Sequence, residues 1–396
     1  MGNVLVLSIA QALAMSGIPI VVLLGGILGG ELAPSPILTT FPVAIMVVGL
    51  ALSTLPAAFL MRKVGRKPGF IGAALLAGLA ALLAGYAVHQ SSFTILCVAT
   101  FLIGTQGAFV QQYRFAAIES VTHERSGRAV SFVLLGGIAA GFLGPEIAVR
   151  ASELFPSALY MGSFIVSAAM YALTALVLLF YREAGTVVLN LDEEGKSLRD
   201  VAAQPSYRLA VFTAAVSYGV MTFVMTATPV HLSGAYGYTL GMTSNVLKSH
   251  IAAMYIPSLF TGYVIDRIGL RQVMLAGAGI LLASGIIGFG AATLAAYYLA
   301  LSLLGLGWNF LFVSVTVLLT KTYSTGERFR AQALNDFLVF GVRATASLSA
   351  GAVLELAGWE TINVIGIALV VLTLFLLVRA RNMLLISRRA EVTVQT

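Results

Sequence analysis

Five charged side chains lie deepest inside long apolar stretches of the chain: the cations Arg114, Lys248 and Arg343 and the acids Glu146 and Asp336. An ionisable group at the centre of a membrane-spanning helix costs at least about 2.5–3.5 kcal/mol, so it usually faces a polar cavity or another charge. Because the cations outnumber the acids, this set favours contact with an anionic or zwitterionic small molecule.

Arg343 is the most informative of these charges because it lies near the middle of its apolar stretch. Asp336 and Ser347 fall on the same helical face, seven residues before it and four residues after it. The guanidinium therefore either pairs with a buried acid or contacts a substrate or coupling ion.

The other charges suggest two ion pairs that open alternately. Glu146 and Lys248 lie at similar depths near one side of the predicted bundle, and Arg114 and Asp336 lie at similar depths near the other. Arg150 competes for Glu146 because it lies one turn further along the same helix.

Proton coupling needs a group that titrates near neutral pH. His250 does so without any shift, and desolvation raises a carboxyl group such as Glu146 or Asp336 towards that range. We expect protons to couple through one of these three residues, although a histidine in such a stretch is often only hydrogen-bonded to a helix neighbour.

Uncharged polar side chains gather on a few of the apolar stretches. They fit either solute contacts or hydrogen bonds between helices, which are worth about 1 kcal/mol each. The candidates are Gln106, Gln111 and Tyr113 on one stretch, Trp308 and Asn309 on a second, and Tyr218 and Thr222 on a third.

The stretches that carry these residues are too long and too apolar for a soluble protein. Hydrophobic residues make up 59% of the 396 residues and charged residues 10%, whereas soluble domains carry about 25% charged residues. A span of about 20 apolar residues crosses a bilayer as a helix. The chain therefore folds in lipid as an all-α, polytopic membrane protein.

Twelve such stretches are present, arranged as six and six. We expect an N-terminal six-helix bundle at 1–181, a cytoplasmic linker at 182–207 with room for one surface helix, and a C-terminal six-helix bundle with a short cytoplasmic tail at 208–396. The stretches are 4–28, 36–61, 68–88, 93–117, 129–150 and 157–181, then 208–230, 244–265, 272–292, 296–320, 332–356 and 361–380.

The basic residues predict the orientation. Most of the 23 Lys and Arg residues fall in alternate loops and at the ends, which places both termini in the cytoplasm of a bacterial inner membrane. The net charge of +7 forms no continuous basic face for nucleic acid. Cys97 is the single cysteine and the four histidines lack metal-site spacing, so we expect no metal and no cofactor.

An internal repeat links the two halves. Residues 58–67, after the second stretch, resemble residues 262–271, after the eighth, and both are short basic turns. Similar halves around a central site near the bilayer midplane are a known plan of secondary transporters.

The second copy resembles the signature loop of the major facilitator superfamily, and several other segments resemble a poorly characterised bacterial group of that family. The first copy departs from the signature because Arg62 stands in place of the acid and Ala58 in place of the glycine. The resemblance implies the fold, two pseudo-symmetric six-helix bundles. Without the resemblance, Asp266 can cap a neighbouring helix and pair with Arg128, and both contacts would hold the inner side shut. The alternative is a helix-end turn whose basic residues only set the topology. The loop residues and their expected partner are Gly262, Asp266, Arg267, Gly269, Arg271, Gly65, Arg66 and Arg128.

Together these observations predict a secondary active transporter that moves a small organic solute by alternating access, coupled to protons, and that acts as a monomer in the bilayer. A drug-type proton antiporter is the alternative within the class. A transporter-like sensor without turnover is the alternative from another class. An enzyme is disfavoured because no nucleophile, base and metal ligands cluster at one depth.

Overall fold

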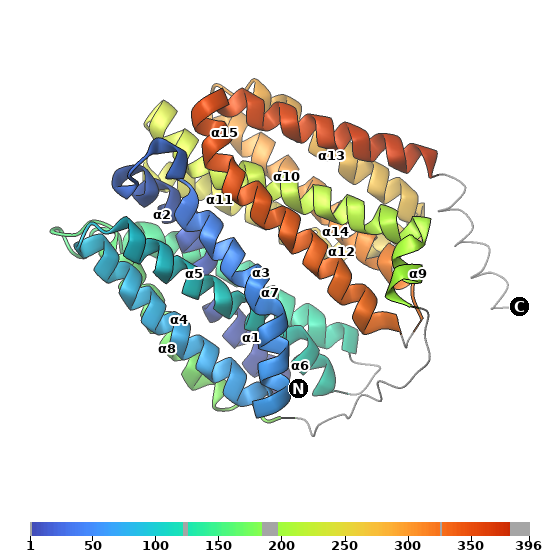
Figure 1. The fold of residues 1–396 in the computed structure, drawn as a ribbon, viewed down its shortest axis with the longest axis horizontal. Helices are drawn as coiled ribbons and strands as arrows, with labels where there is room; N and C mark the ends of the chain where they lie inside the picture. The colour runs from blue at the N-terminus through green and yellow to red at the C-terminus, as the bar shows by residue number, and fades with distance from the viewer. Residues whose placement is uncertain (1, 122–125, 184–196, 325–326, 381–396) are drawn as a thin grey trace, which may run out of the picture. The chain divides into compact units, whose positions relative to one another are not determined.

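The computed structural model describes residues 2–121, 126–183, 197–324 and 327–380, and these residues form helices and short connections without a β-strand (Figure 1). In the first half of the chain the helices are α1 (Gly2–Met15), α2 (Gly17–Leu32), the 3-10 turn η1 (Pro36–Leu38), α3 (Phe41–Val64), α4 (Arg66–His89), α5 (Phe93–Val110), α6 (Tyr113–Glu119), α7 (Ser126–Arg150) and α8 (Met161–Leu178).

The second half of the chain repeats this order after a short linker helix. The linker helix α9 (Leu198–Ala203) lies where the sequence suggested a surface helix. It is followed by α10 (Pro205–Tyr236), α11 (Leu240–Tyr255), α12 (Ser258–Ile268), α13 (Leu270–Phe289), α14 (Leu294–Thr320) and α15 (Arg328–Arg379).

The twelve predicted spans each coincide with a helix or with a pair of broken helices. Nine of the described helical segments are long and apolar enough to cross a membrane. One of them, α15, holds two spans because Gly358 adopts a non-helical conformation within it. The helix α7 and the broken pair α11–α12 complete the set of twelve.

Contacts between residues divide the chain into two compact units. The first unit contains 1–187 together with 225–251 and 347–357, and the second contains 188–224, 252–346 and 358–396. These units follow contacts, whereas the predicted boundaries at 181 and 208 follow the repeat in the sequence, so those boundaries stay a prediction.

Glycine allows helices of the first unit to pack with their backbones in contact. A Cβ atom on Gly104 of α5 would overlap the backbone carbonyl of Met46 on α3, and one on Gly49 of α3 would overlap the carbonyl of Phe101. Close approach through small residues is a general way to join helices in lipid, where no hydrophobic force acts between them. This pair of contacts fixes α3 against α5.

The same device joins α13 and α14 in the second unit. A Cβ atom on Gly307 would lie 2.8 Å from the carbonyl oxygen of Gly277, and one on Gly277 would lie 3.1 Å from the carbonyl oxygen of Gly307. The reciprocal contact positions α14, which carries Trp308 and Asn309.

The eighth span breaks where Pro257 removes a backbone donor. The helix α11 ends at Tyr255 and α12 begins at Ser258. Proline lacks an N–H group and its ring clashes with the preceding turn, so a helix cannot continue through it without distortion.

The two copies of the signature loop share one backbone conformation. Gly65 has φ +93° and ψ +161° between α3 and α4, and Gly269 has φ +99° and ψ +150° between α12 and α13. These angles are open to glycine and rare for other residues. The repeat seen in the sequence is therefore confirmed in the backbone of both loops.

The first loop lacks the acid of the signature, and a carboxylate from another part of the chain takes its place. Glu183, beyond the end of α8, accepts a hydrogen bond of 2.8 Å from the backbone N–H of Lys67 in the first turn of α4. Arg66 pairs with Glu119 of α6 at 2.5 Å. A carboxylate at a helix N-terminus satisfies a free N–H and complements the helix dipole.

Replacing Gly65 by alanine is expected to destabilise the protein by about 1–3 kcal/mol, because an L-residue is strained at this φ and ψ. The added Cβ would also lie 2.8 Å from the Glu183 carboxylate. Thermal unfolding in detergent measures the effect. Gly262→Ala is the matched control, because Gly262 is helical and has no atom within 4 Å of an added Cβ. Equal melting temperatures for the two variants would contradict this account of the loop.

Candidate functional site

Three aromatic rings surround Tyr218 of α10 in the second unit. The ring centroid of Tyr218 lies 5.0 Å from that of Trp308, 5.7 Å from Phe312 and 6.5 Å from Phe340, each in an edge-to-face arrangement. Arg343 lies beside them, with its guanidinium carbon 5.9 Å from the Tyr218 ring centroid. We call these five residues the Tyr218 cluster.

Helical spacing explains how the cluster forms. Trp308 and Phe312 are four residues apart on α14, so they share a face, and their rings stack at 4.7 Å with an interplanar angle of 8°. Phe340 and Arg343 are three residues apart on α15 and also share a face. One face each of α10, α14 and α15 therefore builds the whole cluster.

Arg343 makes a cation–π contact with Tyr218. A guanidinium within about 6 Å of an aromatic ring centroid is attracted by the electron-rich face of the ring. The described residues give Arg343 no ion pair. The predicted alternative, pairing with Asp336, is therefore not seen. Asp336 accepts a hydrogen bond of 3.0 Å from Asn335. Arg343 thus places a guanidinium beside aromatic rings without a neutralising carboxylate, which suits a solute contact.

Asn309, although next to Trp308 in the sequence, is occupied by the protein. Its Nδ2 donates to the backbone carbonyl of Met254 at 2.7 Å, and its Oδ1 accepts from the hydroxyl of Thr261 at 2.6 Å. These bonds join α14 to both sides of the break at Pro257. They favour the structural alternative for Asn309, a link between helices, over solute contact.

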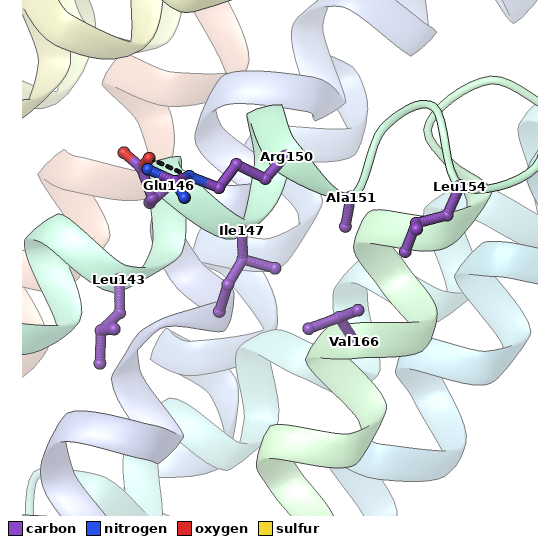
Figure 2. A pocket seen from close by; sticks show the side chains of 7 residues that line it. All are labelled: Leu143, Glu146, Ile147, Arg150, Ala151, Leu154 and Val166. Atoms are coloured by element: carbon purple, nitrogen blue, oxygen red, sulfur yellow. Dashed lines mark hydrogen bonds and ion pairs between the residues drawn. The ribbon is translucent and has the colours of Figure 1, made fainter.

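The predicted Glu146–Lys248 ion pair is present in the first unit, and so is the competing contact with Arg150. Glu146 accepts hydrogen bonds from Lys248 Nζ and from Arg150 Nε, and Figure 2 shows the second of these contacts. The pair joins α7 to α11. Its role in gating or coupling stays a prediction.

An apolar hollow lies beside this ion pair. It has a volume of about 300 Å³. Mainly aliphatic side chains of α7, α8 and the loop between them line it, and Glu146 and Arg150 are the charged residues of the lining (Figure 2). The aliphatic residues are Leu143, Ile147, Ala151, Leu154 and Val166. This lining suits an acyl chain better than a polar solute.

Lys248→Met is expected to lower the thermal stability more than Arg150→Met. The Lys248 side chain is 16% exposed and the Arg150 side chain 80%, and exposed ion pairs contribute little because water and salt screen them. We expect a coupling free energy between Glu146 and Lys248 of about 1 kcal/mol, and less than about 0.5 kcal/mol between Glu146 and Arg150.

Double-mutant cycles with Glu146→Gln measure both coupling energies from unfolding in detergent. The Arg150 cycle is the internal control, because it also removes one positive charge that pairs with the Glu146 carboxylate. A larger coupling energy for Arg150 than for Lys248 would show that the α7–α11 pair is the weaker contact.

The remaining candidates of the first unit have surroundings of other kinds. Gln106 is buried and neither of its amide atoms has a hydrogen-bond partner among the described residues. Gln111 caps the C-terminal end of α5. Tyr113 packs edge-on against Phe70 at 4.7 Å in the core, which favours a structural role. Arg114 lies 4.8 Å from the ring centroid of Phe115.

In the second half of the chain, His250 is fully buried on α11 within the first unit. Arg267 donates to the Tyr263 hydroxyl at 3.0 Å, and Arg271 donates to the Val378 carbonyl at 3.4 Å. Asp266 and Gly262 are exposed. The side chain of Arg128, the expected partner of Asp266, lies outside the described residues, so that contact stays a prediction.

Two members of the Tyr218 cluster were not predicted from the sequence. Phe312 and Phe340 are common apolar residues, and nothing in their type separates them from residues that face lipid. The four-residue spacing of Phe312 from Trp308 was the available signal. Phe340 comes from a different span, so only the packing of the helices reveals it.

The apolar helical bundle, the repeated basic loops and a cation held among aromatic rings define a polytopic membrane transporter. The family model of the Major Facilitator Superfamily matches residues 4–253 and 210–391. The chain belongs to the major facilitator superfamily. It is a multi-pass membrane protein and a secondary transporter of a small solute.

Relatives with known names support this assignment. The chain is 38% identical over 375 residues to the riboflavin transporter RfnT of Brucella anthropi, and the match covers 94% of each chain. It is 27% identical to the uncharacterised MFS-type transporter YdeG of Bacillus subtilis, over 91% of this chain and 87% of that one.

Among solved structures, a bacterial homologue of the human lysosomal transporter Spinster, in an inward-facing and unoccupied conformation, has a similar fold. The TM-score is 0.70 at 14% sequence identity, and the match covers 98% of this chain and 96% of that one. At this identity the similarity concerns the fold alone.

Proposed function

We propose that this protein transports riboflavin or a closely related flavin across the inner membrane by alternating access, coupled to protons. The observation that carries the proposal is the Tyr218 cluster, in which aromatic rings and a guanidinium without an ion pair lie together. The 38% identity to a riboflavin transporter along almost the whole chain supports it.

The chemistry of the cluster suits a flavin. The isoalloxazine ring system is flat and aromatic, with apolar faces and with carbonyl oxygens along one edge. Aromatic side chains such as Trp308 and Phe312 offer surfaces on which a flat ring stacks. Arg343 can donate hydrogen bonds to carbonyl oxygens, and its positive charge suits their partial negative charge.

An organic anion or zwitterion is the second candidate. The cations Arg114, Lys248 and Arg343 outnumber the deep acids, although Lys248 is already paired with Glu146. Riboflavin carries no net charge at neutral pH, whereas its phosphate ester, flavin mononucleotide, is an anion. Preferential uptake of the phosphate ester would favour the anionic solute over riboflavin itself.

Proton coupling is proposed to act through Glu146, His250 or Asp336. Protonation of Glu146 removes the negative charge that holds Lys248 and Arg150, so proton binding would release the contact between α7 and α11. Uptake driven by a pH gradient in liposomes, and lost when the gradient is collapsed, is the expected result. Unchanged uptake without the gradient would remove the proton from the mechanism.

The remaining parts of the proposal concern orientation and assembly. Both termini are placed in the cytoplasm because the loops on that side carry most Lys and Arg residues, and the transporter is proposed to work as a monomer. Cys97 is the only cysteine and is buried, so a cysteine added at either terminus would be the main accessible thiol. A membrane-impermeant thiol reagent should label such a cysteine only after the cell is opened.

Uptake of riboflavin by liposomes that contain the purified protein tests the function. We expect accumulation above the level of protein-free liposomes and above that of liposomes with a competing excess of unlabelled riboflavin. Binding without accumulation would indicate a sensor. Transport of lipophilic cations with no effect of flavins would indicate a drug-type exporter.

A further inference from the structure

Three hydrogen-bonding atoms have no partner in the part of the chain that the structure describes, two of them in the Tyr218 cluster and one on a residue next to Tyr218 on α10. They are the indole Nε1 of Trp308, the hydroxyl Oγ1 of Thr222 and the guanidinium Nε of Arg343. Trp308 and Thr222 are each only 4% exposed. Water therefore has little access to either group.

Some comparable groups elsewhere in the described residues are hydrogen-bonded. The other tryptophan, Trp359, donates its Nε1–H to the carbonyl of Gly288 at 2.7 Å. The buried Thr373 donates its hydroxyl to the carbonyl of Leu369 at 2.9 Å, whereas Thr213 and Thr243, like Thr222, have no partner among the described residues. Burying a polar group without a hydrogen bond costs free energy, so native proteins leave few such groups unpaired.

All three atoms belong to residues that lie around one ring. Thr222 follows Tyr218 by four residues and therefore lies one turn along the same face of α10. Trp308 and Arg343 both contact the Tyr218 ring. Tyr218, Phe312 and Arg343 are partly exposed, so a solute can reach the ring.

We infer that Trp308, Thr222 and Arg343 recognise the carbonyl oxygens along one edge of a planar heteroaromatic solute. The indole and guanidinium groups can only donate hydrogen bonds, and a hydroxyl can also donate. The inference rests on the proposed function and narrows it: acceptors on the ring, rather than aromatic character alone, determine which solutes are bound. A flat aromatic without carbonyl groups leaves these buried donors unpaired, and sites with unpaired donors reject such compounds strongly.

Binding of three flat tricyclic compounds to the purified full-length protein tests the inference. Riboflavin and lumichrome share the dioxo edge, although lumichrome lacks the ribityl chain, and phenazine has no carbonyl group. In a Trp359→Phe background Trp308 is the only tryptophan, and quenching of its fluorescence reports binding. We expect riboflavin and lumichrome to bind at least about tenfold more tightly than phenazine.

Removing one donor should change this preference. Thr222→Val is expected to weaken riboflavin and lumichrome about two- to tenfold and to leave phenazine unchanged, as expected for one hydrogen bond. Trp308→Phe, followed by the fluorescence of the bound flavin and by competition with phenazine, should act in the same way. Thr373→Val is the matched control, because its hydroxyl is buried and already bonded, and it should leave all three affinities unchanged.

The outcomes separate this inference from the proposed function. Phenazine binding as tightly as riboflavin, equal weakening of all three compounds by Thr222→Val, or binding of none of them would overturn the inference. A further outcome is that liposomes fail to accumulate riboflavin while the preference for the dioxo compounds still depends on Thr222 and Trp308. That result would support recognition of oxo groups and contradict riboflavin transport.

Discussion

Arg343→Ala is expected to lower solute uptake about 100-fold, while the protein still inserts and folds. A hydrogen bond from a charged donor contributes about 1.5–3 kcal/mol, and the upper part of this range corresponds to a loss of that size. Folding should survive, because Arg343 makes no ion pair with a described residue, contacts the face of Tyr218 and is partly exposed. Initial uptake rates in liposomes with equal amounts of protein measure the effect.

Arg343→Lys separates charge from geometry. Lysine keeps the positive charge but lacks the planar fork of the guanidinium and its Nε donor. We expect uptake to recover only partly, to about a tenth of the parent rate, because the charge alone does not restore a hydrogen bond of fixed direction. Full activity of Arg343→Ala, with an unchanged affinity for the solute, would exclude Arg343 from the solute site.

Gly104→Leu is expected to abolish accumulation of folded protein. The added side chain would meet the backbone carbonyl of Met46, which cannot move aside as a flexible side chain would. Overpacking costs about 1–3 kcal/mol when neighbouring side chains can adjust, and here the helices α3 and α5 themselves must separate. Size-exclusion chromatography of detergent-solubilised membranes measures how much folded protein remains.

Gly72→Leu is the matched control for this substitution. Gly72 lies within α4 and has no atom within 4 Å of an added Cβ. Leucine also has a higher helix propensity than glycine by about 0.8 kcal/mol. We therefore expect the monodisperse elution of the parent protein. A folded Gly104→Leu variant would show that α3 and α5 are not in backbone contact.

Much of the fold follows from the sequence because lipid imposes a simple rule on the chain. Backbone groups in a bilayer must bond within their own segment, so every long apolar stretch becomes a helix. The stretches 36–61 and 68–88, for example, correspond to α3 and α4. The breaks were harder to predict. Gly358 falls in the predicted gap between the stretches 332–356 and 361–380, and Pro257 indicates a second break. The short connection between α5 and α6 carries no comparably strong signal.

The sequence predicts a residue of the candidate site only where placing that side chain in an apolar span costs free energy by itself. Arg343 stands out because a charge in an apolar span requires an explanation, and the pairing of Glu146 with Lys248 follows from opposite charges at similar depth. Phe312 and Phe340 give no such signal. Asn309 gave a misleading one, because the sequence does not tell whether a buried amide bonds to the protein or to a solute.

The carboxylate of Glu183 has a consequence for how relatives of this chain are recognised. In the first loop the acid expected before the glycine is replaced by Arg62, and an acid from the end of the sixth span bonds the next helix in its place. A sequence search that requires the acid at one fixed position of a contiguous motif would miss such chains. A structural search for any carboxylate that accepts a hydrogen bond from the first turn of the following helix would find them. It would classify the loop by this contact rather than by the residue types of the motif.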